Sequence, residues 1–445
     1  VDLWATLGRS TETRLDRRDG EIRFIGQRPL AAGISDDRSL RGQFGFQGEL
    51  NLRAGQVYAT TLSQVTVAGQ GTDSRLTLSA PEGGSTAQTP LSALASLSLS
   101  ADHIELNATV RQPVGTIDVT ANKTLHLGEQ ARLSVTADGV IVPVGTTVNG
   151  TRWVYSAEGA TTITVPDAEN VVQELSDRIL NKQVTVNGKV LMSLSADAEI
   201  EAQAGGDLLA WQFKAGAGGS TDTFNREGVF AILPGYSYDF APHDSEIRAR
   251  TQQIGTDLKV GDQVTITTSG GALPQGTYTL LDPRYGILPG AVLLSATSLD
   301  VNRALPVAFR KDDGSTLVSG FRTSTGTAQN GGNDVRQAFW LEPETAFRPK
   351  SEVLRTSINE YQNRRAQASG TFVPRAGDGG SVSLSSGQVF DWLARFNLAG
   401  TDDLHAGDFD LSMPDIVVRR SAPQAGETVT VTSVNEQVRL CSVGM

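Results

Sequence analysis

Apolar residues recur in pairs, with one residue between the two members, from Leu76 to Val135. The pairs are Leu76 and Leu78, Leu97 and Leu99, Ile104 and Leu106, Ile117 and Val119, Leu125 and Leu127, and Leu133 and Val135. Because side chains of a β-strand alternate between its two faces, each pair predicts a short strand with one buried face.

The pairs return at intervals of about twenty residues, which is the second signal in this stretch. Leu97 follows Leu76 by 21 residues, and Ile117 follows Leu97 by 20. Leu125 follows Ile104 by 21 residues. A repeat of this length predicts stacked coils of two or three short strands, whose inward residues form one continuous buried column.

An antiparallel sandwich or barrel would also have alternating strands, about 8 to 12 residues apart. In this chain the apolar pairs are short, Gly, Asn, Asp and Ser separate them, and aromatic residues make up only 6% of the sequence. Sandwich cores rely on larger aromatic side chains, so we expect an all-β fold built as a parallel β-helix, or β-solenoid. About 300 residues in coils of ~21 would form about 14 coils, stacked about 4.8 Å apart.

The pattern changes outside this ladder and predicts one or two short lateral helices. One candidate has Val171, Val172, Leu175 and Ile179 on one face, after Pro166 and an Asp167 cap. The clearest helix carries Pro349, Ser351, Leu354, Ile358 and Tyr361 and closes at Gly370. A further candidate has Phe390, Leu393 and Phe396 at helical spacing.

We therefore expect four regions. Residues 1–215 form β-helix coils with extruded loops, and residues 216–320 form a small inserted or attached β module with Gly and Pro turns. Residues 321–370 are a linker and a helix, and residues 371–445 resume the coils.

Composition narrows the function. The net charge is −11 and the pI about 5.0, so no global basic field would attract nucleic acid. Cys441 is the only cysteine, which excludes an internal disulfide, and no run of 18 apolar residues predicts a transmembrane helix. The chain starts at Val1 without a signal peptide, which suggests a segment of something longer or a processed product.

Residues 229–293 carry a resemblance to a known family. VFAILPGYSYDFAPHDSEI, followed by KVGDQVTITTSGGALPQGTYTLLDPRYGILPGAVLL, resembles a region of the large filamentous-haemagglutinin-like exoproteins, the secreted partners of two-partner secretion systems. The resemblance implies a right-handed β-helix stalk and export through an outer-membrane β-barrel transporter. It also implies a secreted or cell-surface location and a role in adhesion or biofilm.

Candidate chemistry is sparse. His103 and His126 precede inward residues, so we expect both to point outward about one coil apart, as surface residues without a third metal ligand. Four acidic residues lack the spacing of known calcium loops and predict a solvated turn: Asp402, Asp403, Asp408 and Asp410. No cofactor, metal or catalytic residue is predicted.

The densest aromatic group is the one most suited to bind a ligand. Tyr236, Tyr238 and Phe240, with His243, could form a sugar-stacking surface, or could fasten the β module to the coils. We expect a non-enzymatic adhesin segment, a rigid stalk with possible binding of host or matrix glycans or proteins. The alternatives are a carbohydrate-active β-helix enzyme, either a polysaccharide lyase or a hydrolase, and a cargo-bearing part of a contact-dependent toxin system.

Overall fold

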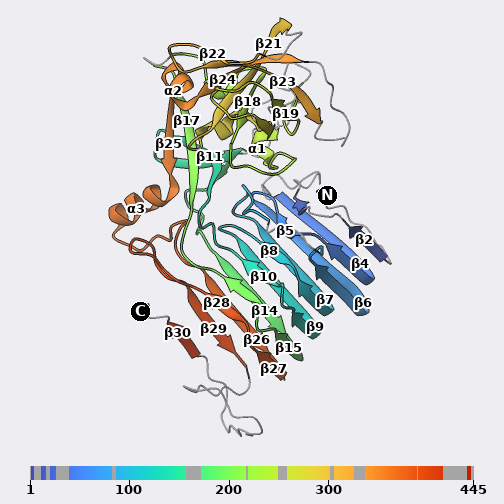
Figure 1. The fold of residues 1–445 in the computed structure, drawn as a ribbon. Coiled ribbons are helices and arrows are strands. Elements are labelled where there is room, and N and C mark those ends of the chain that lie inside the picture. The colour runs from blue at the N-terminus through green and yellow to red at the C-terminus, as the bar shows by residue number, and fades with distance from the viewer. Residues whose placement is uncertain are drawn as a thin grey trace, which may run out of the picture. The chain divides into compact units, whose positions relative to one another are not determined.

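The computed structural model describes residues 2–4, 12–16, 21–26, 40–82, 87–156, 172–216, 219–248, 258–300, 305–324, 336–387, 389–413 and 438–441. These residues are mostly in β-strands, which form long parallel sheets and an antiparallel half-barrel (Figure 1). The chain divides into two compact units. The first comprises residues 1–142, 179–207 and 361–445, and the second comprises residues 143–178 and 208–360.

The larger sheet of the first unit is parallel along almost its whole length. Its strands follow in the order β2 (Glu12–Asp16), β4 (Leu40–Arg53), β6 (Ser63–Ser79), β7 (Ser96–Asn107), β9 (Thr116–Leu127), β14 (Gln183–Gly188), β26 (Ser381–Ser386) and β29 (Asp408–Ser412). Strands β15 (Leu191–Leu194) and β27 (Val389–Trp392) continue it beside β9. The last strand, β30 (Val438–Cys441), pairs antiparallel with β29.

A second parallel sheet lies in the same unit. It contains β1 (Asp2–Trp4), β3 (Glu21–Ile25), β5 (Gln56–Ala59), β8 (Thr109–Arg111), β10 (Arg132–Ser134), β16 (Glu199–Glu201) and β28 (Arg395–Asn397), in that order. The chain passes repeatedly from one parallel sheet to the other, for example from β9 to β10 and from β15 to β16. The first unit therefore has the alternation that a coiled chain requires.

Apolar residues of successive strands face each other in register and form the core of the first unit. Leu97 lies opposite Ile117, and Ile104 lies opposite Leu125, as their spacing predicted. The predicted alignment of Leu76 with Leu97 is wrong, because Leu76 lies opposite Ile104. The reason is that β6 is one strand of 17 residues that carries two apolar pairs, and a long loop precedes β7.

The parallel sheets contain fewer strands than the sequence predicted. The larger sheet holds eight parallel strands in succession in the part of the chain that the structure describes, where about 14 coils were expected. At about 4.8 Å per step, eight strands span about 34 Å. One reason is that residues 143–178, which the estimate counted among the coils, belong to the second unit. Another is that some steps are longer than 21 residues, as from Val65 to its partner Leu97.

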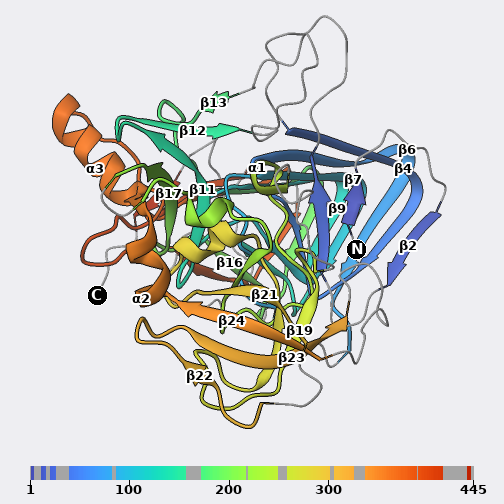
Figure 2. The ribbon, with the colours of Figure 1, turned by 90° about the horizontal axis from the view of Figure 1, so that it is seen from above.

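The second unit contains two further sheets. In the first, β13 (Val172–Glu174), β12 (Arg152–Ser156), β11 (Ile141–Val148), β17 (Asp207–Lys214) and β25 (Glu352–Ser357) lie side by side. The second is the antiparallel half-barrel β18 (Val229–Ile232), β21 (Val292–Asp300), β24 (Gln337–Pro343), β23 (Thr316–Ser324), β19 (Gln263–Ile266) and β20 (Gly276–Thr279), with β22 (Phe309–Arg310) on β23. Figure 2 shows β19, β21, β23 and β24 of this sheet together. Its core includes Phe230, Val264, Leu294, Val318 and Phe339.

Of the three predicted helices, one is present in the described residues. The clearest one exists as α3 (Ile358–Ser369) and closes at Gly370, whose φ of 66° suits glycine, but the residues before it form β25. The helix predicted over Val171–Ile179 is wrong where the structure describes it, because Val172–Glu174 is strand β13, paired with β12. The candidate around Phe390 is also wrong, because β27 and β28 pair there with the parallel strands β15 and β16.

Short helical turns complete the described elements. They are α1 (Ser245–Arg248), α2 (Glu344–Phe347) and the 3-10 turns η1 (Thr223–Asn225), η3 (Pro283–Ile287) and η4 (Arg348–Lys350). Pairing with a neighbouring strand satisfies the backbone hydrogen bonds, so tertiary context overrides the helical spacing at the two wrong positions.

Candidate functional site

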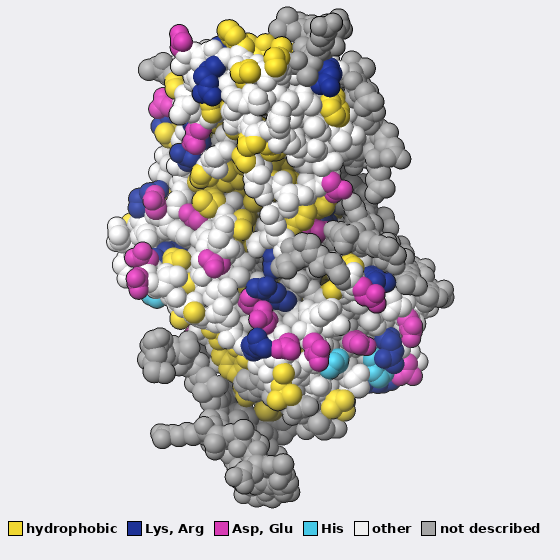
Figure 3. Space-filling model, viewed as in Figure 1, with side chains coloured by type: hydrophobic (Ala, Val, Ile, Leu, Met, Phe, Trp, Pro, Cys, Tyr) yellow, Lys and Arg dark blue, Asp and Glu magenta, His cyan; other side chains and the backbone are white. Residues whose placement is uncertain are grey.

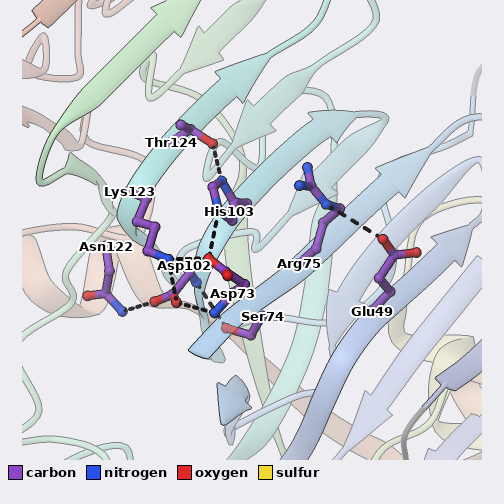
Figure 4. A network of polar contacts seen from close by, with 9 residues as sticks. All are labelled: Glu49, Asp73, Ser74, Arg75, Asp102, His103, Asn122, Lys123 and Thr124. Atoms are coloured by element: carbon purple, nitrogen blue, oxygen red, sulfur yellow. Dashed lines mark hydrogen bonds and ion pairs between the residues drawn. The ribbon is translucent and has the colours of Figure 1, made fainter. Parts of the chain in front are cut away.

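A network of charged and polar side chains crosses the outer face of the larger parallel sheet (Figure 4). We call it the outer network, and its members are Asp73, Asp102, His103, Asn122 and Lys123. Its residues come from β6, β7 and β9, at the points where the register of these strands shifts. The shift lets extra polar residues sit between two apolar pairs without turning either pair outward.

Asp102 is the centre of the outer network. Its carboxylate accepts hydrogen bonds from the backbone N–H of Asp73 at 2.7 Å and from Asn122 Nδ2 at 3.0 Å. Lys123 Nζ lies 3.6 Å from the same carboxylate and also donates to Asp73. The hydrogen bonds from Asn122 and from the Asp73 backbone lower the pKa of Asp102, so the carboxylate is held in its charged form.

His103 extends the network across the sheet. Its Nδ1 lies 2.7 Å from Thr124 Oγ1 in the next strand, and its Nε2 lies 3.7 Å from Asp73 Oδ1 in the preceding one. The hydrogen bond and charge of Lys123 lower the pKa of Asp73, and the same hydrogen bond raises the pKa of Lys123. Each strand is therefore connected to the next by polar bonds on the outside as well as by apolar contacts within.

The network reaches a fourth strand through Lys189, whose Nζ donates to Asn122 Oδ1 at 2.8 Å. Lys189 follows β14 directly, and 67 residues separate it from Asn122 in the sequence. In the space-filling view, acidic, basic and histidine side chains gather in a mixed band over the parallel strands (Figure 3). This mixed character suits bonds between successive strands better than the attraction of one charged ligand.

Both histidines lie at outward positions, but the sequence analysis missed the network around His103. His103 is half-buried and His126 is exposed, and both belong to the outward-facing positions of adjacent strands. The missed residues Asp73, Asp102 and Lys123 each stand two or three positions before the second apolar pair of their strand. An alignment of the coil sequences by their apolar pairs would have placed these three charged residues next to one another.

The predicted aromatic residues do come together. Tyr236 and Tyr238 meet edge to face with ring centroids 5.4 Å apart, and Tyr238 stacks on Phe240 at 5.1 Å. The Tyr236 hydroxyl donates to the Phe240 carbonyl at 2.7 Å, and the backbone of Tyr238 accepts from Thr279 of β20. The three rings, which we call the aromatic cluster, and the neighbouring His243 are all half-buried, so part of each side chain faces solvent.

A buried polar cluster directly beyond His243 was not predicted. Asp244 is 4% exposed and accepts hydrogen bonds from the Tyr155 hydroxyl at 2.9 Å and from the Glu246 N–H at 2.8 Å. Burial raises the pKa of Asp244 and of Tyr155. Asp244 caps the short turn α1, a role that the pattern Asp-Ser-Glu-Ile signals in sequence.

Arg284 completes the buried polar cluster. It is 2% exposed, and none of its three side-chain nitrogens has a hydrogen-bond partner in the described part of the chain. Its guanidinium lies 5.0 Å from the centre of the Trp211 ring, and its charge lowers the pKa of Asp244 against the effect of burial. The Trp211 ring and the negative charge of Asp244 therefore stabilise this buried cation.

The described residues do not form a metal centre. No group of three or more His, Cys, Asp or Glu side chains among them is placed to hold an ion. Asp402, Asp403 and Asp408 are exposed, and Asp410 is half-buried on β29. No helix in the described ranges is long and apolar enough to cross a membrane.

Comparison of the chain with protein-family models, with curated proteins and with solved structures found no match. Its function must therefore be argued from its own geometry.

Proposed function

We propose that the chain is a structural segment of a secreted or surface-attached bacterial adhesin, and that its first unit is a right-handed parallel β-helix acting as a rigid stalk. The observation that supports this most directly is a column of buried apolar residues that continues from strand to strand in the larger parallel sheet. The buried residues Val65, Leu97, Ile117, Val184 and Val382 lie opposite one another in five successive strands.

Handedness follows from a general rule. Connections between parallel strands of one sheet are right-handed in nearly all proteins, because strand twist favours that crossing. The chain leaves the larger sheet, visits the smaller one and returns, which is such a connection repeated. The resemblance of residues 229–293 to filamentous-haemagglutinin-like exoproteins supports the same hand, and export through an outer-membrane β-barrel transporter.

Rigidity comes from packing and backbone pairing. Each buried Val or Leu adds about 1.5–3 kcal/mol relative to exposure, and every strand donates hydrogen bonds to its neighbours. The sequence contains a single cysteine, so no internal disulfide contributes. Such a stack needs neither a disulfide nor a cofactor, which suits a chain that folds after it has crossed a pore.

The second unit supplies the surface for binding. Residues 208–360 of this unit lie in the chain between β14 and β26, which pair directly with each other in the larger sheet. The aromatic cluster of this unit presents three half-buried rings close together. Rings in this state offer apolar faces on which the C–H groups of a sugar can stack, so we assign glycan binding to Tyr236, Tyr238 and Phe240, with His243 beside them.

Glycan-array binding tests the proposal. The purified chain should bind a subset of glycans, and the double variant Tyr236→Ala, Tyr238→Ala should lose at least tenfold in signal. Phe372→Ala is the matched control, because Phe372 is an exposed aromatic residue of the first unit. Binding that survives the double variant unchanged would remove the aromatic cluster as a receptor site.

A carbohydrate-active β-helix enzyme is the second candidate, and the outer network favours it. Asp73, Asp102, His103 and Lys123 place two carboxylates, an imidazole and an ammonium group on the outer face of parallel strands. These are groups that can move protons in polysaccharide cleavage. Turnover of a surface polysaccharide that disappears with Asp102→Asn would establish the enzyme and end the proposal of an adhesin without activity.

A further inference from the structure

The outer face of the half-barrel carries apolar side chains where solvent would favour polar ones. Phe309, Leu317 and Trp340 come from β22, β23 and β24, and they lie directly opposite one another across the strands. We call these three residues the apolar row. The residues that alternate with them, Val318, Phe339 and Leu341, belong to the core on the other face. A sheet with one buried face normally presents polar side chains on the other.

The apolar row is accessible. Phe309 is 61% exposed and the nearby Val307 is 68% exposed, while Leu317 and Trp340 are half-buried. Hydrophobic side chains gather over this part of the half-barrel in the space-filling view (Figure 3). The rings of Phe309 and Trp340 meet edge to face, with centroids 6.3 Å apart.

A cation stands over this surface. Lys311 Nζ lies 3.7 Å from the centre of the Trp340 ring, and Lys311 is exposed. Its ammonium group forms no ion pair in the described ranges, whereas the nearby Lys350 is paired with Glu342 at 2.9 Å. Asp313 accepts a hydrogen bond from the Ser315 N–H at 2.8 Å, which lowers its pKa, and the charges of Lys350, 4.0 Å away, and of Lys311 lower it further. Lys311 can therefore meet an anion beside the exposed Phe309 ring and the half-buried Trp340 ring.

We propose that the apolar row and Lys311 form a second binding surface, specific for acidic pyranose units of a polysaccharide. The C–H face of the sugar would stack on Trp340 and Phe309, and its carboxylate or sulfate would pair with Lys311. This occupant fits better than a neutral sugar because the ammonium group covers part of the Trp340 ring until an anion draws it away. The inference rests on the proposed role in glycan adhesion and names the class of glycan.

Fluorescence titration with oligogalacturonate tests the proposal, with the fully methyl-esterified oligomer as the neutral probe of the same sugar. The wild-type chain should bind the acidic oligomer at least tenfold more tightly than the ester, and added salt should weaken that binding. Lys311→Gln should lose this preference but keep the weak binding of the ester. Trp340→Ala should lose binding of both.

Two controls keep the test decisive. Lys189→Gln removes an exposed lysine of the first unit and should leave binding unchanged. Trp340→Phe retains a ring and should bind within about threefold of wild type, which separates loss of the surface from loss of folding. Equal affinity for acid and ester, or binding unaffected by Lys311→Gln and Trp340→Ala, would overturn the proposal.

The outcome is separable from that of the proposed function. Glycan-array binding that depends on Tyr236 and Tyr238 but not on Trp340 would sustain the adhesin while refuting this second surface. Concentration-dependent self-association that Trp340→Ala abolishes, without any binding of acidic sugar, would identify the apolar row as a contact between copies of the chain and would likewise refute it.

Discussion

Val184 and Val382 lie directly opposite each other in the adjacent parallel strands β14 and β26, although residues 208–360 of the second unit separate them in the chain. Both side chains are fully buried. Pairing in a stack depends only on the strands directly above and below, so a large insertion at a corner leaves the register intact. The parallel stack can thus accommodate an inserted unit without a break in its core.

Strand β26, which follows the insertion, should contribute as much to the stability of the stack as the strands before the insertion. Leu384 is fully buried opposite Val186, so Leu384→Ala is expected to lower the free energy of unfolding by about 2–5 kcal/mol. Ser383→Ala, at the neighbouring outward position, should change it by less than about 0.5 kcal/mol. Urea denaturation followed by circular dichroism measures both. Equal effects of the two variants would show that β26 does not pack into a common core.

The outer network should stabilise the stack modestly and only while its carboxylates are charged. Asp102→Ala removes the acceptor of the Asp73 N–H, so that amide should exchange its hydrogen faster than in the wild type. Because the pKa of Asp102 is lowered, its contribution is present above the unfolded value of 3.8 and is lost as pH falls through the folded value below it. The variant should therefore differ from the wild type more at pH 6 than at pH 2.5 in denaturation experiments. Glu105→Ala, on the outward face of the same strand, is the control.

Lys182 should destabilise the folded chain at neutral pH. It is 5% exposed, its Nζ has no hydrogen-bond partner among the described residues, and burial lowers its pKa from 10.5 to about 8. Between pH 8 and 10.5 the unfolded chain binds more protons than the folded chain. The free energy of unfolding that depends on this group is therefore highest above pH 10.5 and is lost as the pH falls through about 8.

Lys182→Met is accordingly expected to raise the free energy of unfolding at pH 7 by about 1–3 kcal/mol. The free energy of unfolding of the wild type should increase between pH 8 and 10.5, and the part of this increase that is due to Lys182 should be absent from the variant. Lys259→Met, at an exposed position, supplies the comparison. Parallel pH profiles of wild type and Lys182→Met would contradict this account of the buried amine.

Asp244 and Arg284 should be coupled. Asp244→Asn leaves the buried guanidinium of Arg284 facing only the Trp211 ring, so the variant should lose about 1–3 kcal/mol of stability. Adding Arg284→Met removes the unpaired charge and should restore at least half of that loss. Chemical denaturation of the four proteins in this cycle measures the coupling. Strictly additive effects would show that the two groups do not interact.

The strands of the first unit could be predicted because their signal is local. Leu97, Leu99, Ile117 and Val119 alternate with polar residues, and burial enforces this pattern within each strand. The aromatic cluster was also predictable, because Tyr236, Tyr238 and Phe240 are close in sequence.

The parts that could not be predicted depend on partners distant in the chain. Val172–Glu174 becomes a strand because β12 offers it hydrogen bonds, and Phe390 lies in β27 because β15 is its neighbour. Arg284 and Trp211 come into contact only when the second unit has folded, and the sequence around each residue does not predict this contact. Spacing within a segment carries no information of this kind.

The distance between two outward positions tests the central claim most directly, which is that one parallel stack runs through the whole first unit. Thr66 and Asp410 occupy the same outward column, five strand steps apart, which corresponds to about 24 Å along the stack. Spin labels at Thr66→Cys and Asp410→Cys, in a chain with Cys441→Ser, would report this separation by pulsed electron resonance. The account predicts a single narrow distribution centred near 24 Å. A broad distribution, or one centred beyond about 40 Å, would contradict a continuous stack.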